Sequence, residues 1–212
     1  MYCGVDVGLK KCHAAVISDG VEFVGEYEEL DLSDVKLAGI DAPLSFPERG
    51  AFRECERLLL KMGIRLFPPT ASFFRKISLR GMEIAEELRK KGVKVYEVYP
   101  YATRVILDIA PKAKKRTKDG LSEIICSLSR FVEVEKANHD EVDAIIAALT
   151  VMLYDRGKGI LLKGSDGEIV VPKGNLQLSL GGFGKVNNPT TTRILYENLS
   201  PLPFMPSRKG IL

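Results

Sequence analysis

The chain has 212 residues, of which 45% are hydrophobic and 28% are charged, and its formal net charge is +3. These values are typical of a soluble globular protein with one domain, or one domain and an appendage, and they permit an anionic partner without requiring one. The four cysteines show no Cys-x-x-Cys pairing, so we expect them to be reduced core residues. The sequence shows no signal-peptide pattern and no apolar run of membrane-spanning length. We therefore expect a cytoplasmic protein with no membrane partner.

The first predicted elements are strands. Two β-prone runs flank Asp19-Gly20, a dipeptide that favours a tight hairpin turn. They predict paired strands, with a third strand near residues 21–28. A further buried strand is expected over 37–41, and Pro43 follows its end.

Helical spacing of apolar residues begins after that strand. It predicts one helix from Phe52 to Met62 and a second helix over roughly 78–91, each followed by a glycine that favours termination. Residues 93–100 predict a short strand, which its final proline ends.

Two further helices are expected, one near 119–132 and one over about 139–155. Asn138 and Glu141 have the spacing of a capping box at the start of the second of these helices. This alternation of strands and helices after an initial run of strands predicts an α/β fold, with a mixed sheet covered by helices.

The composition changes near the C-terminus. A hairpin is predicted around Asp166-Gly167, and the sequence after it is rich in Gly, Asn, Pro and Thr. We expect residues 1–172 to form one domain. Residues 173–212 are expected to be an extension that is wrapped on the surface or partly disordered.

Five acidic residues lie within the predicted strands or at the start of the last predicted helix, and they are Asp6, Asp41, Glu97, Asp140 and Asp143. An ionised carboxylate among apolar residues is costly unless it is paired or binds a metal. Two acids at neighbouring strand ends repel each other, and a divalent cation turns that repulsion into ligation. Asp140 and Asp143 are spaced i, i+3 on one helical face. Such hard oxygen ligands favour Mg²⁺ or Mn²⁺, and a pair of these ions can promote the attack of water on a phosphodiester.

Each acid has a structural alternative when it is taken alone. Asp6 could cap a turn, Asp41 could form a turn before Ala-Pro, and Asp140 suits the dipole at a helix start. Glu97 could point outward from an alternating strand. The joint pattern is more specific than any single residue.

This joint pattern resembles the RNase H-like superfamily, and especially its RuvC-type branch. The resemblance is carried by GVDVG at 4–8, GIDAP at 39–43 and HDEVDAIIAAL at 139–149. Together with FPPT and GMEIAEELRKKGVKVYEVYP, these segments look like a family of uncharacterised proteins described as predicted RNase H-fold nucleases. The resemblance covers about residues 1–172. It implies a mixed five-stranded sheet with helices on both faces, and a nuclease that hydrolyses nucleic acid with two metal ions.

The resemblance also implies roles for the acids. Asp6, Asp41, Asp140 and Asp143 would hold two ions of Mg²⁺ or Mn²⁺. Asp41 stands where RuvC-type resolvases carry glutamate, and Glu97 is an additional acid that could replace or supplement it.

Other polar groups could serve the same site. His139 could orient water, shuttle a proton or join the metal shell, or it could be a surface residue, whereas His13 is predicted to be structural. Lys10 could meet a phosphate or belong to a solvated turn. A dense basic stretch could neutralise a nucleic-acid backbone or be a solvated loop. Its members are Lys112, Lys114, Lys115, Arg116 and Lys118.

A second basic cluster contains Arg75, Lys76 and Arg80, next to Phe73 and Phe74. Basic groups beside aromatic rings suit an unpaired nucleic-acid strand, because bases stack on the rings. The two phenylalanines could equally belong to the core.

Two other functions stay open at this point. GVDVG also resembles the phosphate loop of the actin and sugar-kinase superfamily, which would make the protein a nucleotide-binding protein. The same fold could alternatively be a non-catalytic module that binds nucleic acid. The sequence does not distinguish DNA from RNA, and it leaves a homodimer open.

Overall fold

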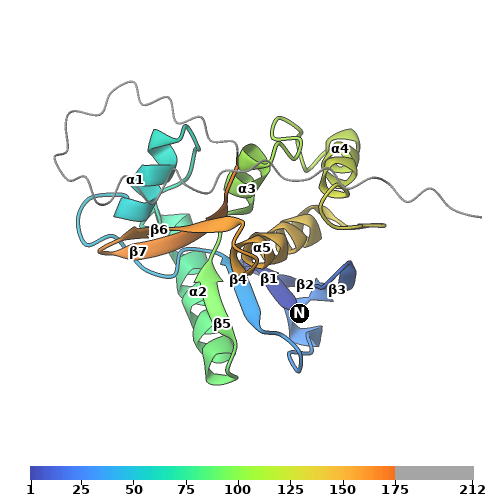
Figure 1. The fold of residues 1–212 in the computed structure, drawn as a ribbon. Coiled ribbons are helices and arrows are strands. Elements are labelled where there is room, and N and C mark those ends of the chain that lie inside the picture. The colour runs from blue at the N-terminus through green and yellow to red at the C-terminus, as the bar shows by residue number, and fades with distance from the viewer. Residues whose placement is uncertain (175–212) are drawn as a thin grey trace, which may run out of the picture. The chain divides into compact units, whose positions relative to one another are not determined.

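The fold of residues 1–174, which a computed structural model describes, is built on a mixed five-stranded sheet (Figure 1). The order of its strands is β3-β2-β1-β4-β5. β1 pairs antiparallel with β2, and β2 with β3, whereas β1, β4 and β5 run parallel. The strands are β1 (Tyr2–Asp6), β2 (His13–Ile17), β3 (Val21–Glu26), β4 (Leu37–Asp41) and β5 (Lys94–Glu97).

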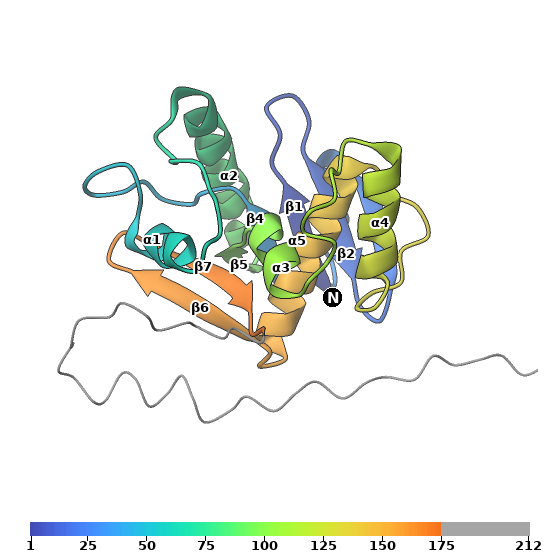
Figure 2. The same ribbon diagram turned by 90° about the horizontal axis from the view of Figure 1, so that it is seen from above.

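Helices cover both faces of this sheet, and Figure 2 shows α2 on one side of the strands and α4 and α5 on the other. One apolar cluster joins α4 and α5 to β2, and another joins α2 to β1, β4 and β5. The helices are α1 (Glu54–Lys61), α2 (Ser72–Lys90), α3 (Pro100–Ile106), α4 (Lys118–Leu128) and α5 (His139–Asp155), and a 3-10 turn spans Tyr27–Glu29. The predicted α/β class and the RNase H-like sheet are thereby confirmed.

A two-stranded sheet of β6 (Gly159–Gly164) and β7 (Gly167–Pro172) lies beside the main one. Val98, just after β5, forms an isolated parallel bridge with Val170 of β7. The antiparallel pairing of β6 with β7 confirms the hairpin predicted around Asp166-Gly167. The extension predicted for 173–212 lies, from residue 175 onward, outside the described residues.

Three helix predictions differ from the structure. α2 begins at Ser72, earlier than the predicted 78, and α4 ends at Leu128. α3 was not predicted at all, because Pro100 was interpreted as the end of a strand. Proline is also favoured in the first turn of a helix, where its missing N–H has no partner to lose.

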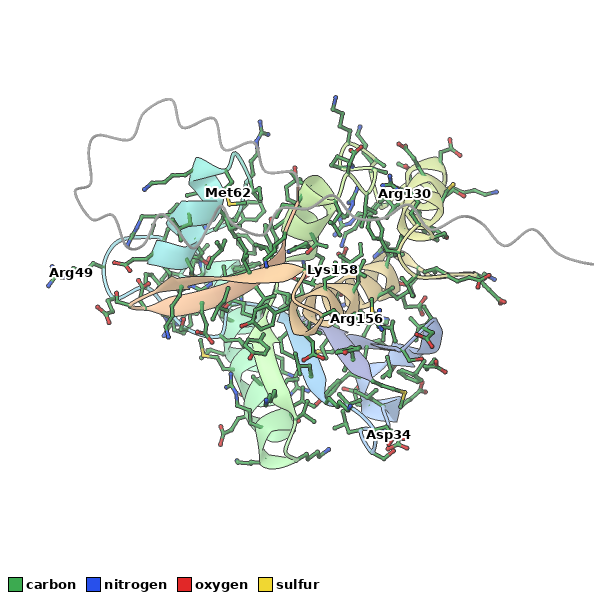
Figure 3. All side chains as sticks on the ribbon, in the orientation of Figure 1. Asp34, Arg49, Met62, Arg130, Arg156 and Lys158 are labelled. Carbon is green, nitrogen blue, oxygen red and sulfur yellow. The ribbon has the colours of Figure 1, made fainter. Side chains whose placement is uncertain are left out.

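The cysteine prediction is correct for three of the four residues. Cys3, Cys12 and Cys55 are buried, whereas Cys126 is exposed. Cys126 lies on α4 between the buried Ile124 and Leu128, so the helical period turns it toward solvent. Charged side chains such as Asp34, Arg49 and Arg130 lie on the outside of the fold (Figure 3). No helix among residues 1–174 has the length and apolar character needed to cross a membrane.

The close packing of α5 on the sheet depends on two glycines. Gly4 of β1 pairs in register with Gly39 of β4, and both face α5. A Cβ atom on Gly4 would lie 2.0 Å from the Ala144 carbonyl oxygen, and one on Gly39 would lie 2.8 Å from that of Ala147. The helix backbone therefore rests directly on the strand backbone, with no side chain between them.

The same register places two acids beside the start of α5. Asp6 and Asp41 are the next residues on the α5 face after the two glycines, because side chains alternate along a strand. They pair in register with each other. The close approach of the helix therefore brings strand-end carboxylates near its own first turns.

Candidate active site

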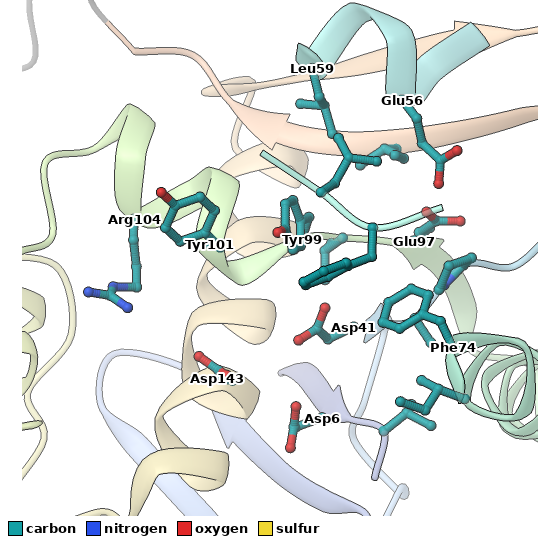
Figure 4. A pocket seen from close by; sticks show the side chains of 18 of the residues that line it. Asp6, Asp41, Glu56, Leu59, Phe74, Glu97, Tyr99, Tyr101, Arg104 and Asp143 are labelled. Atoms are coloured by element: carbon teal, nitrogen blue, oxygen red, sulfur yellow. The ribbon is translucent and has the colours of Figure 1, made fainter. Parts of the chain in front are cut away.

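A cavity of about 540 Å³ opens at the ends of β1 and β4. Asp6, Asp41 and Asp143 line it, and Figure 4 shows their carboxylates directed toward a common space. Asp143 belongs to the second turn of α5, so the three acids come from three elements far apart in the sequence. Each offers an oxygen atom, and these three oxygens all lie within 4.8 Å of one another.

The acids occupy an environment that disfavours negative charge. Burial, together with the nearby Asp143, raises the pKa of Asp6 to about 7. Burial raises the pKa of Asp41 well above its ordinary value, and Asp6 and Asp143 add to that rise. Burial also raises the pKa of Asp143, and Lys115 opposes that rise. Without a cation the cluster is therefore electrostatically costly.

The donor set fits a divalent cation. Burial and the charges of neighbouring side chains shift the pKa values of Asp6 and Asp41. No hydrogen bond from residues 1–174 to either carboxylate adds to these shifts. Mg²⁺ and Mn²⁺ favour carboxylate ligands of this kind, which lie close together and accept no hydrogen bond from residues 1–174. Such an ion would be held by Asp6, Asp41 and Asp143.

Asp140 lies in a different group from Asp41. Donor atoms of Asp6, His13 and Asp140 lie within 4.8 Å of one another. His139 Nδ1 lies 2.7 Å from Asp140 Oδ1 and is directed to that carboxylate rather than into the three-acid cluster. Asp6 is therefore the only one of these acids that belongs to both groups among the described residues.

Lys115 places an ammonium group inside the cavity, where it forms an ion pair with Asp143. The loop that carries it is tied to α3 by Arg104, whose guanidinium donates to the carbonyl oxygens of Ile109, Ala110 and Ala113. The sequence placed Lys115 in a basic stretch that could contact a nucleic-acid backbone or be a solvated loop. In the structure Lys115 is only partly exposed and pairs with Asp143, whereas its basic neighbours Lys112, Lys114, Arg116 and Lys118 are exposed.

Residues 4–166 match the family described as "Protein of unknown function (DUF429)". The chain belongs to this family. The family predicted from the sequence, with an RNase H-like fold, is thereby confirmed. No curated protein matches the chain. Among solved structures, RuvC from Thermus thermophilus is 13% identical to it, with a TM-score of 0.43 over 78% of this chain and 98% of that chain.

Glu97, the additional acid of this DUF429 chain, points to a different partner. Its oxygens accept hydrogen bonds from Arg53, at 2.5 and 2.7 Å, and from the Leu44 backbone N–H at 2.7 Å. Arg53 is fully buried and also pairs with Glu56 at 2.9 Å. Glu97 therefore neutralises a buried arginine, and the structure does not bring it into the three-acid cluster.

Two arginines near the site went unnoticed in the sequence, and they are Arg104 and Arg53, which hold the surrounding loops. His13, which was predicted to be structural, stands beside Asp6. A signal existed for Arg104, since it interrupts the otherwise uncharged helix PYATRVI. No comparable signal existed for Arg53, because its partner Glu97 lies 44 residues away. Lys10, which the sequence assigned either to a phosphate contact or to a solvated turn, is exposed in the β1–β2 connection.

The raised pKa of Asp6 predicts how the stability of the cation-free protein depends on pH. The folded state keeps the Asp6 proton up to about pH 7, whereas the unfolded state releases it near 3.8. The stabilising contribution is therefore complete below the unfolded pKa and is lost as the pH rises through the folded pKa. We expect a higher melting temperature at about pH 5.5 than at about pH 8 in the presence of a chelator.

Two controls accompany this pH measurement. Asp6→Asn should reduce the difference between the two pH values, and Mn²⁺ should raise the melting temperature at the higher pH. A melting temperature that climbs steadily from the lower to the higher pH in chelator would contradict the electrostatic account.

Proposed function

We propose that the protein is a metal-dependent nuclease that hydrolyses the phosphodiester bonds of nucleic acid. The observation that carries this proposal is the convergence of Asp6, Asp41 and Asp143 within 4.8 Å of one another at the edge of a cavity. Three carboxylates in this arrangement are costly on their own and become favourable around a divalent cation.

Mg²⁺ or Mn²⁺ is the cation that this oxygen-only set suits. When bound, it supplies Lewis acidity and a water molecule of lowered pKa. Asp6, Asp41 and Asp143 would hold the cation at the ends of β1 and β4. Lys115 lines the same cavity and would meet a phosphodiester bound there.

Among residues 1–174, Lys115 is the group best placed to meet the phosphate. In the structure its charge is paired with Asp143, and the charges of Asp6 and Asp41 act on it as well. If these carboxylates held a cation, the Lys115 ammonium group would have a phosphate oxygen as its alternative partner. Lys115 would then stabilise negative charge that develops during hydrolysis.

The surroundings of the cavity suit a nucleic-acid chain. Lys112, Lys114 and Lys118 are exposed around Lys115 and can contact phosphates outside the cavity, whereas Arg116, which is also exposed, lines the cavity itself. On the other side, Phe67 and Phe74 line the cavity, and Phe67 contacts Phe73 edge to face at 5.8 Å. Phe67 and Phe73 are 63% and 54% exposed, so both could stack on unpaired bases.

The proposal is tested with a panel of end-labelled DNA and RNA in single-stranded, duplex and junction forms. We expect cleavage of at least one of these substrates in Mn²⁺ or Mg²⁺, and none in a chelator. Asp6→Asn run in parallel should be inactive, which excludes a contaminating nuclease.

The outcomes of this panel separate the candidate functions. Metal-dependent binding of nucleic acid without any cleavage would favour a non-catalytic binding module. No metal effect at all, combined with protection against thermal unfolding by ATP, would favour the nucleotide-binding alternative. Either result contradicts the nuclease proposal.

A further inference from the structure

The cavity extends past the three acids, around the end of β5, to the side of the sheet that α2 covers. Glu97 pairs in register with Ile40 of β4, so its side chain shares the face of Ile40, which packs against α2. Asp41, the next residue of β4, is directed to the other side, where it meets the acid of α5. Both Asp41 and Glu97 line the cavity, and Figure 4 shows Glu97 on the far side of Asp41 from Asp6. A volume of about 540 Å³ is in the range that holds a small organic group as well as a cation.

The walls of this second part of the cavity are mostly apolar and aromatic. Its lining includes Leu59 of α1, Phe67, Phe74 of α2 and Tyr99. The ring centroids of Phe67 and Phe74 lie 6.5 Å apart, with an angle of 46° between the ring planes. The Tyr99 hydroxyl donates to the Arg65 carbonyl oxygen at 2.8 Å, which fixes the position of its ring. Rings of this kind suit a flat aromatic ligand, because a nucleobase offers a π face for stacking.

Negative charge is in excess in the same part of the cavity. Glu56 and Glu97 both line it, and the single guanidinium of Arg53 pairs with both carboxylates. Burial raises the pKa of Glu97, although Arg53 opposes that rise. From residues 1–174, Glu56 accepts two hydrogen bonds and Glu97 accepts three, whereas a carboxylate can accept about four. The two carboxylates therefore favour a ligand that donates hydrogen bonds.

We propose that this part of the cavity binds an unpaired nucleobase that carries an exocyclic amino group. Adenine, cytosine and guanine have such a group, whereas thymine and uracil have a carbonyl oxygen in place of the amino group of cytosine. The base stacks on the aromatic rings and donates from its amino group to Glu56 or Glu97. The proposal rests on the proposed function, because it places the phosphate of the same nucleotide beside Asp41 and Lys115.

This inference narrows the class of substrate. A base that is stacked in a duplex cannot enter the cavity, so it must be unpaired already or leave the stack. The preferred substrate is therefore a strand with an unpaired adenine, cytosine or guanine beside the bond that is cut.

The test compares bases that differ only in the amino group. Fluorescently labelled DNA duplexes carry a one-base bulge of cytosine, uracil, adenine or hypoxanthine, and a fully paired duplex is the reference. Uracil and hypoxanthine have a carbonyl oxygen where cytosine and adenine have the amino group. Binding to the full-length protein is measured by fluorescence anisotropy in Ca²⁺, which also takes carboxylate ligands. A gel checks that each DNA is intact after the titration.

We expect the cytosine and adenine bulges to bind at least about tenfold more tightly than the uracil and hypoxanthine bulges, because only they donate to a charged acceptor. Glu56→Gln should remove most of this preference, since an amide also donates. Glu86→Gln is the matched control on the exposed side of α2, and it should keep the preference.

Phe74→Ala is the second variant, and it decides the question if Glu56→Gln does not fold. It should weaken the binding of every bulge roughly fivefold or more, because a stacking surface is lost. Binding of the fully paired duplex should stay unchanged, since no base of that duplex enters the cavity. Melting temperatures show which variants are folded.

Equal binding of the cytosine and uracil bulges by the wild-type protein would overturn the proposal, and so would an undiminished preference in folded Glu56→Gln or undiminished bulge binding in Phe74→Ala. Deoxycytidine monophosphate that binds as tightly as the cytosine bulge would assign the pocket to a free nucleotide and contradict the strand. A preference in Ca²⁺ without any cleavage in Mn²⁺ refutes the nuclease proposal alone. A nuclease that binds and cuts all four bulges equally refutes the base pocket alone.

Discussion

Replacing Asp6 by asparagine is expected to lower nucleic-acid cleavage by more than about 100-fold while leaving the fold intact. Loss of groups that merely support metal ligands costs roughly 10–100-fold, and loss of a ligand itself should cost more. The side-chain volume is nearly unchanged, but the negative charge is gone. Asp143→Asn is expected to have a similar effect on cleavage, because it removes the acid contributed by α5.

The stability of Asp6→Asn distinguishes a functional role from a structural one. Burial and the neighbouring Asp143 make ionised Asp6 unfavourable, so asparagine should raise the melting temperature in a chelator near pH 8. An inactive but more stable variant is typical of a residue kept for function at the expense of stability. Cleavage and melting temperature are measured on the same preparation.

Asp19→Asn is the matched control for Asp6→Asn. Asp19 is exposed at the hairpin tip, and Asn-Gly favours the same turn as Asp-Gly. This control should cleave at the wild-type rate. Wild-type activity in Asp6→Asn, or equal loss in both variants, would show that Asp6 has no part in the reaction.

Gly4→Ala is expected to destabilise the protein by about 3 kcal/mol or more, at the upper end of the roughly 1–3 kcal/mol typical of overpacked cores. The added Cβ would lie 2.0 Å from the Ala144 carbonyl oxygen and 2.3 Å from the Ala148 backbone nitrogen. Both atoms belong to the backbone of α5, so no side-chain rotation relieves the contact. The helix or the strand must move.

The displacement should also reach the acids. Asp143 is adjacent to Ala144, so a shift of α5 away from β1 separates its carboxylate from Asp6. We therefore expect weaker Mn²⁺ binding in Gly4→Ala, as well as a lower free energy of unfolding in urea.

Gly20→Ala provides the control for Gly4→Ala. A Cβ atom on Gly20 would have no heavy atom within 4 Å, so this variant should be close to wild type. If Gly4→Ala unfolds at the wild-type urea concentration, α5 does not rest on the strand as described.

Local patterns were enough to predict much of the fold. Period-2 and period-3.6 spacing, together with Asp-Gly turns and glycine stops, depend on neighbouring residues and on the geometry of one element at a time. The same local logic singled out Asp6 and Asp41, because each is an acid at the end of an apolar strand. It misjudged Pro100, because a proline is compatible both with the end of a strand and with the first turn of a helix.

The sequence by itself therefore determined which segments become strands and helices, and which acids stand at their ends. Only the tertiary structure decided which of those acids meet. It paired Glu97 with the distant Arg53, carried Lys115 from a basic loop to Asp143, and set His13 beside Asp6. Such contacts depend on register between strands and on how closely α5 can approach the two glycines. Neither is visible from residue spacing, because both arise from packing between segments that lie far apart along the chain.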